Sequence, residues 1–389
     1  MLRFLLPLLL ALLLPACSTL SDFKDDIGER FFGRDTKEPP AALVDFKPTM
    51  EARILWQVSV GSGDVYDFTP ALSANAVYAA GADGDITRIG VSDGKQAWRI
   101  NAGERLSGGV GAGGNLVLAG TPKGMVLAFD QTSGKPLWKS RVSSEVLSAP
   151  VVSGGVVVVR CGDSRIFGLS VADGKRKWVY ERATPALTLR SGAGVTIADG
   201  IAYVGFAGGK LVALGVDDGR VLWEASVALP KGTTEIERIA DITSLPVVDG
   251  RYVYAVAYQG RIAGVERGSG RVLWNRDISS YTGLGVDGTH LFVTQTNGAV
   301  YAVDYSSGKS YWRQGALLNR QISAPLPVGR YVALGDLEGY VHFLDREDGV
   351  FAARIKTDSS AIMAQPVALG SSAVLVQTRG GGLYAISLK

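Results

Sequence analysis

The stretch Gly124-MVLAFDQTS-Gly134-KPL-Trp138 decides the fold, because its pattern recurs along the chain. Each copy has a Gly (Ser in one copy), a short alternating apolar strand, a polar turn that ends in Gly, and then a Trp. The other complete copies are Gly84-DITRIGVSD-Gly94-KQA-Trp98, Ser164-RIFGLSVAD-Gly174-KRK-Trp178, Gly209-KLVALGVDD-Gly219-RVL-Trp223, Gly260-RIAGVERGS-Gly270-RVL-Trp274 and Gly298-AVYAVDYSS-Gly308-KSY-Trp312. A seventh copy, Gly339-YVHFLDRED-Gly349-VFA-Ala353, has lost its Trp, and the chain ends in a half copy, Gly382-LYAISLK.

All seven tryptophans of the chain belong to this pattern. Six occupy the repeat position, and the seventh, Trp56, lies just ahead of the first copy. A large ring on an outer strand can fill the gap between neighbouring units while its N–H reaches a backbone acceptor. An exposed stacking platform for a sugar or cofactor would not need six copies in register. We therefore predict a structural role for Trp56, Trp98, Trp138, Trp178, Trp223, Trp274 and Trp312.

Each unit of about forty residues is predicted to form four short strands separated by Gly, Asp and Ser turns, which is typical of a propeller blade. Seven complete units are followed by the C-terminal half copy, which begins an eighth unit. The outer strand of this eighth unit is missing because the chain stops at Lys389. The strand around Trp56 can supply it, and joining the two ends closes the ring without open edges. The prediction is an all-β fold, an eight-bladed β-propeller of four-stranded antiparallel blades over residues 51–389.

Composition excludes several classes of protein. The chain has 389 residues, 47% of them hydrophobic, which excludes a disordered protein. Forty basic residues face 37 acidic ones, and no basic stretch is dense enough to suggest nucleic-acid binding. Two Cys and two His leave little material for a metal site, a disulfide framework or His/Cys catalysis. We predict no catalytic residues and no metal ligands.

Isolated candidates for metal or redox chemistry have simpler explanations. His290 and His342 lie in different units without a Cys/Asp cluster at ligand spacing. Cys161 is a strand residue without a disulfide partner. Asp residues near the repeat turns usually bond their own backbone rather than a metal ion; they are Asp130, Asp217, Asp304 and Asp345.

The N-terminus, MLRFLLPLLLALLLPAC, has one early positive charge and an apolar run too short to span a bilayer. It fits a secretory signal, and Leu14-Pro15-Ala16-Cys17 resembles a bacterial lipobox. The alternative is an ordinary signal with an accidental Cys. The resemblance implies that residues 1–16 are removed as a signal peptide and that Cys17 carries acyl chains, including palmitate, that anchor the protein.

Residues 17–50 have mixed charge, few aliphatics and a Pro39-Pro40 pair, which predicts a lipidated tether. By resemblance to enterobacterial lipoproteins, Ser18 permits export to the outer membrane. The expected location is the periplasmic face of the outer membrane of a Gram-negative bacterium.

The segments that end at Trp138 and Trp312 resemble the tryptophan-docking repeat of quinoprotein dehydrogenases. Those enzymes are eight-bladed propellers that carry pyrroloquinoline quinone (PQQ), calcium and typically a pair of adjacent cysteines. This chain has no adjacent cysteines and is much shorter. The repeat therefore indicates the fold of this chain, and a shared fold alone does not establish a shared function.

The lipobox, tether and propeller together resemble the BamB family, lipoproteins of the outer-membrane β-barrel assembly (Bam) complex. The segments 183–190 and 232–241 resemble the two loops with which that family engages the central assembly subunit, BamA. The second segment lies in the longest gap between repeat tryptophans. The partner-binding residues that the resemblance implies are Leu187, Leu189, Arg190, Glu235, Arg238 and Asp241. Thr243 stands where the family commonly has a second acidic residue.

Three functions follow as hypotheses. The first is a non-enzymatic scaffold that binds BamA, aids insertion of outer-membrane proteins and binds their nascent strands by β-augmentation, with no cofactor beyond the lipid on Cys17. The second is a PQQ-dependent dehydrogenase. The third is another envelope lipoprotein that binds polysaccharide or a different protein. The alternative for Leu187 and Leu189 is packing within a blade, and for Arg190 and Asp241 a solvated surface pair.

Replacing the predicted lipidation site tests the processing. Cys17→Ala should give an unacylated protein that leaves the membrane fraction, because the acyl chains are then missing. Mass spectrometry of the mature wild-type protein should show a modified Cys17, and an unmodified Cys17 there would end the hypothesis.

Overall fold

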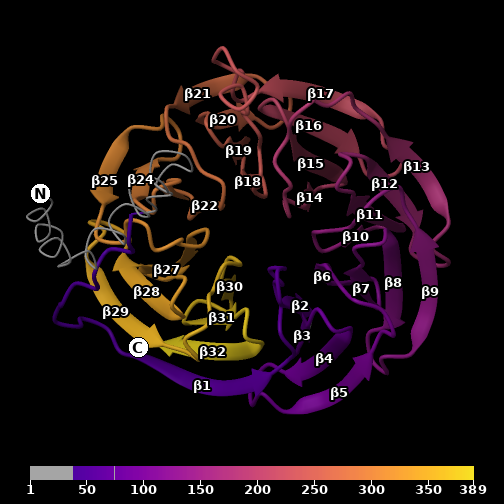
Figure 1. Ribbon diagram of the computed structural model, residues 1–389, viewed down its shortest axis with the longest axis horizontal. Helices are drawn as coiled ribbons and strands as arrows, with labels where there is room; N and C mark the ends of the chain where they lie inside the picture. Colours follow the sequence, from indigo (N-terminus) through magenta and orange to yellow (C-terminus); the bar gives the residue numbers. More distant parts are fainter. Residues whose placement is uncertain (1–37, 74) are drawn as a thin grey trace, which may run out of the picture. The chain divides into compact units, whose positions relative to one another are not determined.

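The computed structural model describes residues 38–73 and 75–389, and its regular elements there are all strands. They form eight four-stranded antiparallel sheets that follow one another around a ring (Figure 1). This confirms the predicted eight-bladed propeller. No helix among the described residues is long and apolar enough to cross a membrane. The predicted signal peptide, Cys17 and most of the predicted tether lie outside the described residues.

Each blade runs from an inner strand beside the ring centre to an outer strand at the rim (Figure 1). Blades 1 to 4 are in chain order β2 (Ala71–Ser73), β3 (Ala76–Ala80), β4 (Asp85–Gly90), β5 (Gln96–Asn101); β6 (Gly108–Gly113), β7 (Leu116–Gly120), β8 (Met125–Asp130), β9 (Pro136–Arg141); β10 (Val151–Ser153), β11 (Val156–Arg160), β12 (Ile166–Ser170), β13 (Arg176–Tyr180); and β14 (Val195–Ala198), β15 (Ile201–Phe206), β16 (Lys210–Gly215), β17 (Val221–Ser226).

The remaining blades repeat this arrangement, and blade 8 takes its outer strand from the start of the chain. Ala52 pairs with Leu388 and Ser59 with Gly382, as the predicted closure requires. Blades 5 to 8 are β18 (Val247–Asp249), β19 (Tyr252–Val256), β20 (Ile262–Glu266), β21 (Val272–Arg276); β22 (Gly283–Val286), β23 (His290–Thr294), β24 (Val300–Asp304), β25 (Ser310–Gln314); β26 (Leu326–Val328), β27 (Tyr331–Gly335), β28 (Tyr340–Asp345), β29 (Phe351–Lys356); and β30 (Val367–Ala368), β31 (Ala373–Gln377), β32 (Gly382–Leu388), β1 (Ala52–Ser59).

The tryptophans join neighbouring blades. Each ring lies against the Gly of the next blade's outer hairpin turn, and a Cβ on that Gly would come within 2.5–3.2 Å of the ring. These glycines have φ between 67° and 74°, a left-handed conformation that favours Gly. Six indole N–H groups donate to backbone carbonyls of the neighbouring blade at 2.8–3.1 Å. The Trp–Gly pairs are Trp56–Gly94, Trp98–Gly134, Trp138–Gly174, Trp178–Gly219, Trp223–Gly270, Trp274–Gly308 and Trp312–Gly349.

Trp98 is the exception in its hydrogen bonding. Its N–H has no acceptor among the described residues. The carbonyl of Gln131 stands at the position that accepts the indole N–H in the other blades, and here the Tyr78 hydroxyl donates to it at 3.0 Å. The Trp98 ring still packs on the Gly134 turn, so the blade contact persists without the hydrogen bond.

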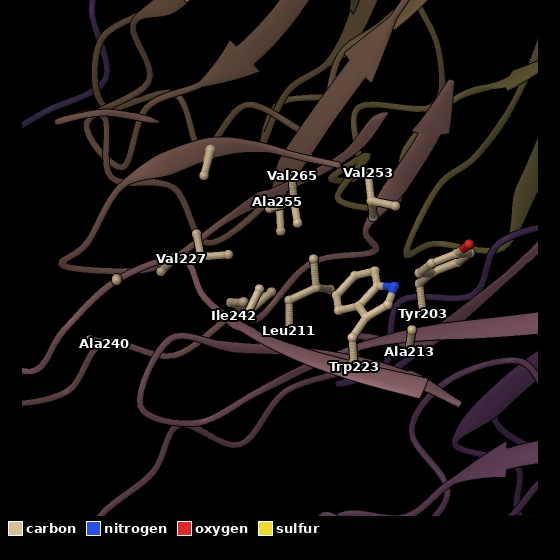
Figure 2. Close-up of a cluster of buried hydrophobic side chains, with 14 residues drawn as sticks. Tyr203, Leu211, Ala213, Trp223, Val227, Ala240, Ile242, Val253, Ala255 and Val265 are labelled. Atoms are coloured by element: carbon tan, nitrogen blue, oxygen red, sulfur yellow. The ribbon is translucent and has the colours of Figure 1, made fainter. Parts of the chain in front are cut away.

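Apolar side chains fill the space between neighbouring sheets. Figure 2 shows one such cluster, in which Tyr203, Leu211 and Trp223 of blade 4 meet Val253 and Val265 of blade 5. Apart from β17, which supplies Trp223, the strands that supply them are buried on both faces, which explains their nearly continuous apolar sequence. The core is therefore a series of inter-blade layers rather than one central mass.

The interface between blades 7 and 8 lacks both partners of the Trp–Gly contact. Ala353 occupies the Trp position, and no outer hairpin turn joins β32 to β1, because β1 comes from the other end of the domain. Met50 is buried in this interface, in a cluster that includes Ala353 and Tyr384. The backbone N–H groups of Thr49 and Met50 donate to the carbonyl of Ala352. Residues just before β1 therefore fill the place of the missing indole.

The residues before Met50 contact blade 7 as well. The Phe46 ring stacks on Phe351 with centroids 5.3 Å apart. The Arg354 guanidinium lies 5.0 Å from the Phe46 ring centroid and 5.4 Å from that of Phe351, a cation–π arrangement. Arg320 donates to the carbonyl of Ala41 at 2.9 Å. The end of the segment predicted as a tether thus packs on the propeller from Ala41 onward.

His342 belongs to a buried polar network beneath this segment. Its Nε2 lies 2.9 Å from Asp336, and the Arg354 Nε–H donates to its Nδ1 at 3.2 Å. Nδ1 therefore accepts and Nε2–H donates to the carboxylate. Burial lowers the pKa of His342 and favours the neutral ring. The Asp336 carboxylate also accepts from Arg320 at 2.7 and 2.8 Å.

A pair of glycine substitutions measures the Trp–Gly contact. Gly219→Ala should lower the free energy of unfolding, because its Cβ would lie 2.5 Å from the Trp178 ring. Gly370 has the same φ of +70° and no heavy atom within 4 Å, so Gly370→Ala reports the backbone strain alone. In urea unfolding, we expect Gly370→Ala to lower the free energy of unfolding by about 1–2 kcal/mol. Gly219→Ala should lower it by about 1–3 kcal/mol more than that. Equal losses would show that the indole contact contributes nothing.

Truncating Met50 tests whether it supports the last interface. Met50→Ala should cost about 2–5 kcal/mol, the usual range for a buried Met, measured by thermal or urea unfolding. Val44, of the same segment, is 38% exposed and serves as the control, so Val44→Ala should change stability by well under 1 kcal/mol. A Met50→Ala variant as stable as Val44→Ala would contradict this role.

Candidate functional site: two loops beside the central cavity

Two connections between blades are longer than the others. The first loop, residues 181–194, joins β13 to β14, and the second loop, residues 227–246, joins β17 to β18. They contain all six residues that the sequence predicts for partner binding. Each loop leaves an outer strand and returns to the inner strand of the next blade, so the loops lie on neighbouring blades.

Asp241 holds the two loops together. Its carboxylate accepts from the backbone N–H of Leu189 at 2.8 Å and of Gly208 at 3.1 Å. The Ser191 hydroxyl donates to the carbonyl of Thr243 at 3.0 Å, which adds a second link. Asp241 is only 4% exposed. The sequence placed it on a charged rim, whereas the structure places its carboxylate beneath the loops, because buried backbone N–H groups require an acceptor there.

Apolar packing fixes the backbone on either side of Asp241. Ala240 and Ile242 are each 1% exposed and belong to the core cluster of Figure 2. A Cβ on Gly205 of β15 would lie 2.2 Å from Ile242, so only Gly lets the second loop approach this strand so closely. This packing therefore fixes the position of the Asp241 carboxylate.

Arg160, at the end of β11, supplies a positive charge toward Asp241. Burial lowers the pKa of Arg160 to about 10, against the opposing effect of Asp241, and the guanidinium stays charged at neutral pH. It donates to the carbonyl of Ala193 in the first loop at 3.0 Å and lies 5.8 Å from the Phe206 ring centroid. The first loop is thus anchored from blade 3 as well.

Arg190 points to a different partner from Asp241. Its guanidinium makes two hydrogen bonds to the Glu145 carboxylate, at 2.9 and 2.7 Å, and lies 5.8 Å from the Tyr66 ring centroid. The hydrogen bond to Glu145 raises the pKa of Arg190. The Arg190 side chain remains 57% exposed. It is therefore held in place while most of it still faces solvent.

Apolar side chains are exposed on both loops. Leu187 of the first loop is 41% exposed, and Leu189 is half-buried. The second loop exposes three more aliphatic side chains, Leu229 (66%), Ile236 (66%) and Leu245 (44%). Packing within a blade, the alternative weighed for Leu187, does not describe its position. The sequence prediction missed these three residues, although aliphatics in a segment without strand periodicity could have indicated them.

The charged residues predicted on the second loop lie on a short turn. Glu235 and Arg238 are exposed. Between them, the Glu237 carboxylate accepts from the backbone N–H of Thr233 at 2.8 Å and of Thr234 at 3.1 Å, while the Glu237 N–H donates to the Thr234 hydroxyl. This reciprocal arrangement is that of a capping box, and the bonds to the backbone N–H groups lower the pKa of Glu237. The turn keeps its neighbours at the surface.

A central cavity of about 330 Å³ is lined by residues from all eight connections between blades, with Arg190 of the first loop and Thr243 of the second among them. The Thr243 hydroxyl donates to the carbonyl of Tyr281 at 3.1 Å. A carboxylate at this position could not make that hydrogen bond, because two acceptors would then face each other. The only carboxylate among the described lining residues, Asp67, pairs with Arg379 at 2.8 Å.

The residues with redox or metal chemistry lie apart. Nowhere in residues 38–73 and 75–389 do three or more His, Cys, Asp or Glu side chains meet at a spacing suited to a metal ion. Cys161 lies just after β11 rather than within a strand, and burial raises the pKa of its thiol to about 11. A thiol with so high a pKa is a poor nucleophile at neutral pH.

Sequence comparison finds relatives along nearly the whole chain. Residues 52–314 match the family model described as outer membrane protein assembly factor BamB. A protein of that name from Nitrosomonas eutropha is 44% identical over 384 residues, which covers 98% of this chain and 93% of the relative. The chain therefore aligns with this relative over nearly its full length.

Solved structures show the same fold. The crystal structure of BamB from Moraxella catarrhalis has a TM-score of 0.80 and 27% identity, covering 87% of this chain and 100% of that one. A quinohemoprotein alcohol dehydrogenase from Comamonas testosteroni has a TM-score of 0.71 but only 13% identity, covering 89% of this chain and 78% of that enzyme, so the likeness is one of fold alone. The extent and identity of the family matches establish that this chain belongs to the BamB family of outer membrane protein assembly factors.

Proposed function

We propose that this protein is a non-enzymatic scaffold of the Bam complex that binds the central assembly subunit, BamA, through the first and second loops. The observation that carries the proposal is the set of exposed aliphatic side chains on two loops that a buried carboxylate joins. Apolar side chains that gather on neighbouring loops beside charged residues are typical of protein–protein interaction sites. The names of the relatives support the assembly function.

The arrangement resembles the anatomy of a protein–protein interface. Leu187, Leu229 and Ile236 supply apolar contacts, while Arg190, Glu235 and Arg238 supply a charged rim. Binding energy usually concentrates in a few apolar or Arg anchors that become fully desolvated. Because Asp241 and Glu145 already hold the backbone and the guanidinium, less conformational entropy is lost when a partner binds.

The anchoring of the protein completes the proposal. The relatives are named outer membrane protein assembly factors, and the lipobox-like sequence that ends at Cys17 supports acylation of this residue. We therefore propose a lipid-anchored protein on the periplasmic face of the outer membrane, with the covalent lipid as its only added group. The rigid propeller then acts as a platform that presents both loops near the membrane.

Co-purification tests the partner surface. The triple variant Leu187→Ala, Leu189→Ala and Arg190→Ala should lose binding to the central assembly subunit by well over tenfold, because each anchor is worth about 2 kcal/mol or more. Its melting temperature and circular dichroism should stay near wild type, since Leu187 and Arg190 are largely exposed. The measurement is the yield of the partner recovered from detergent extracts with tagged protein.

A matched variant controls for lost surface area and charge. Leu55 and Leu222 are 55% and 42% exposed on outer strands, and Arg53 is a surface residue paired with Glu51. Replacing these three residues by Ala should leave partner recovery unchanged. Wild-type recovery with the folded loop variant would refute the proposal. A loss of several kcal/mol in stability would show instead that the side chains act in the core.

A further inference from the structure

The outer strands of blades 2 and 3 carry an unusual set of basic side chains. β9 exposes Lys139 and Arg141, and β13 exposes Arg176 and Lys177. These strands lie next to each other on the rim of the ring (Figure 1). Neither strand contains an acidic residue. Within the described part of the chain, none of the four side chains makes an ion pair or a side-chain hydrogen bond.

Basic residues on the other outer strands are already engaged. Arg53 of β1 pairs with Glu51, and Arg99 of β5 pairs with Asp85. The remaining basic residues contact backbone or aromatic groups. Arg276 donates to the carbonyl of Gly308, Arg313 to the Tyr301 hydroxyl and Arg354 to Nδ1 of His342, while Lys356 lies over the Tyr340 ring. The four basic residues of β9 and β13 are thus a local surplus of positive charge.

A groove of about 340 Å³ runs between the two blades at this point. Arg141 lines it from blade 2, and Arg165 and Arg176 line it from blade 3. Glu181 is the acidic residue in the lining, and Arg165 holds it at 2.8 Å while also pairing with Asp163 at 3.0 Å. Arg141 and Arg176 therefore face the groove without a counter-charge.

Exposed aliphatic side chains accompany the basic ones. Leu137 is 52% exposed and shares a face of β9 with Lys139 and Arg141, because alternate residues of a strand point the same way. On β13, Val179 is 39% exposed, two residues after Lys177. The surface therefore combines basic and aliphatic groups around one groove.

We propose that this groove binds the headgroup of an anionic phospholipid, with Arg141 and Arg176 on the phosphate. Guanidinium groups bind phosphate oxygens in pairs, and Lys139 and Lys177 add attraction to an anionic surface. Leu137 and Val179 favour lipid over an acidic peptide, since aliphatic side chains beside Lys and Arg suit the boundary between headgroups and acyl chains. Some twenty residues separate Cys17 from Glu38, and such a segment spans at most about 70 Å. This length is sufficient for the rim of the propeller to reach the membrane.

Vesicle co-sedimentation tests the proposal with the whole mature chain carrying Cys17→Ser, so that no acyl chain contributes. The Cys17→Ser protein with an otherwise unchanged sequence should bind equimolar phosphatidylglycerol–phosphatidylcholine vesicles and should bind vesicles of phosphatidylcholine alone only weakly. The double variant Arg141→Gln and Arg176→Gln should bind about tenfold or more weakly, since each basic residue near an anionic surface contributes about fivefold. Higher salt should weaken wild-type binding.

The control variant removes the same charge elsewhere on the surface. Arg53→Gln with Arg330→Gln changes two exposed, ion-paired guanidiniums and should bind as the wild type does. Equal losses in both variants would overturn the proposal, because net charge alone would then explain binding. Binding of an acidic peptide without vesicle binding would overturn it as well. If the groove variant does not fold, Lys139→Gln with Lys177→Gln provides the same comparison, and unchanged vesicle binding there would refute the proposal.

Discussion

The contact between an indole ring and the glycine turn of the next blade is the constraint on which this structure depends. The same glycine adopts a left-handed conformation that forms the hairpin and leaves room for the ring against which it packs. One residue pair therefore sets both the shape of a blade and its distance from its neighbour. Because seven such pairs follow one another around the ring, the central cavity and the positions of the inter-blade loops are set by them too.

The sequence alone was sufficient for the fold, because both members of each contact recur at a fixed spacing and the orphan Trp56 strand matches the missing strand at the other end. It was not sufficient for the interface between blades 7 and 8. Met50 and Phe46 carry no repeat signal, and they become meaningful only once β29 and β32 are side by side. The same applies to His342, whose partners Asp336 and Arg354 lie on separate strands or turns.

The candidate site shows a similar division. The two loops were recognisable as insertions in a regular repeat, and Leu187 and Arg190 lie at the surface as expected for a binding role. The position of Asp241 was not recognisable, because its hydrogen-bond partners are backbone N–H groups distant in sequence, which have no sequence signature. Glu145 was missed for the same reason. The basic groove between β9 and β13 also emerges only when the two blades are placed side by side.

Because β1 pairs with β32, the blades of this protein form in two different ways. Seven blades form from contiguous sequence and need only short loops to close, whereas the eighth must bring together the two ends of the domain. A loop about eight times longer costs roughly 2 kcal/mol more in closure entropy, a modest thermodynamic difference. The kinetic consequence is larger, because β1 is the first strand in the sequence and has no partner until β32, the last strand, is present. Until then its edge is open to aggregation, and the period before closure is when a chaperone would protect this protein most effectively.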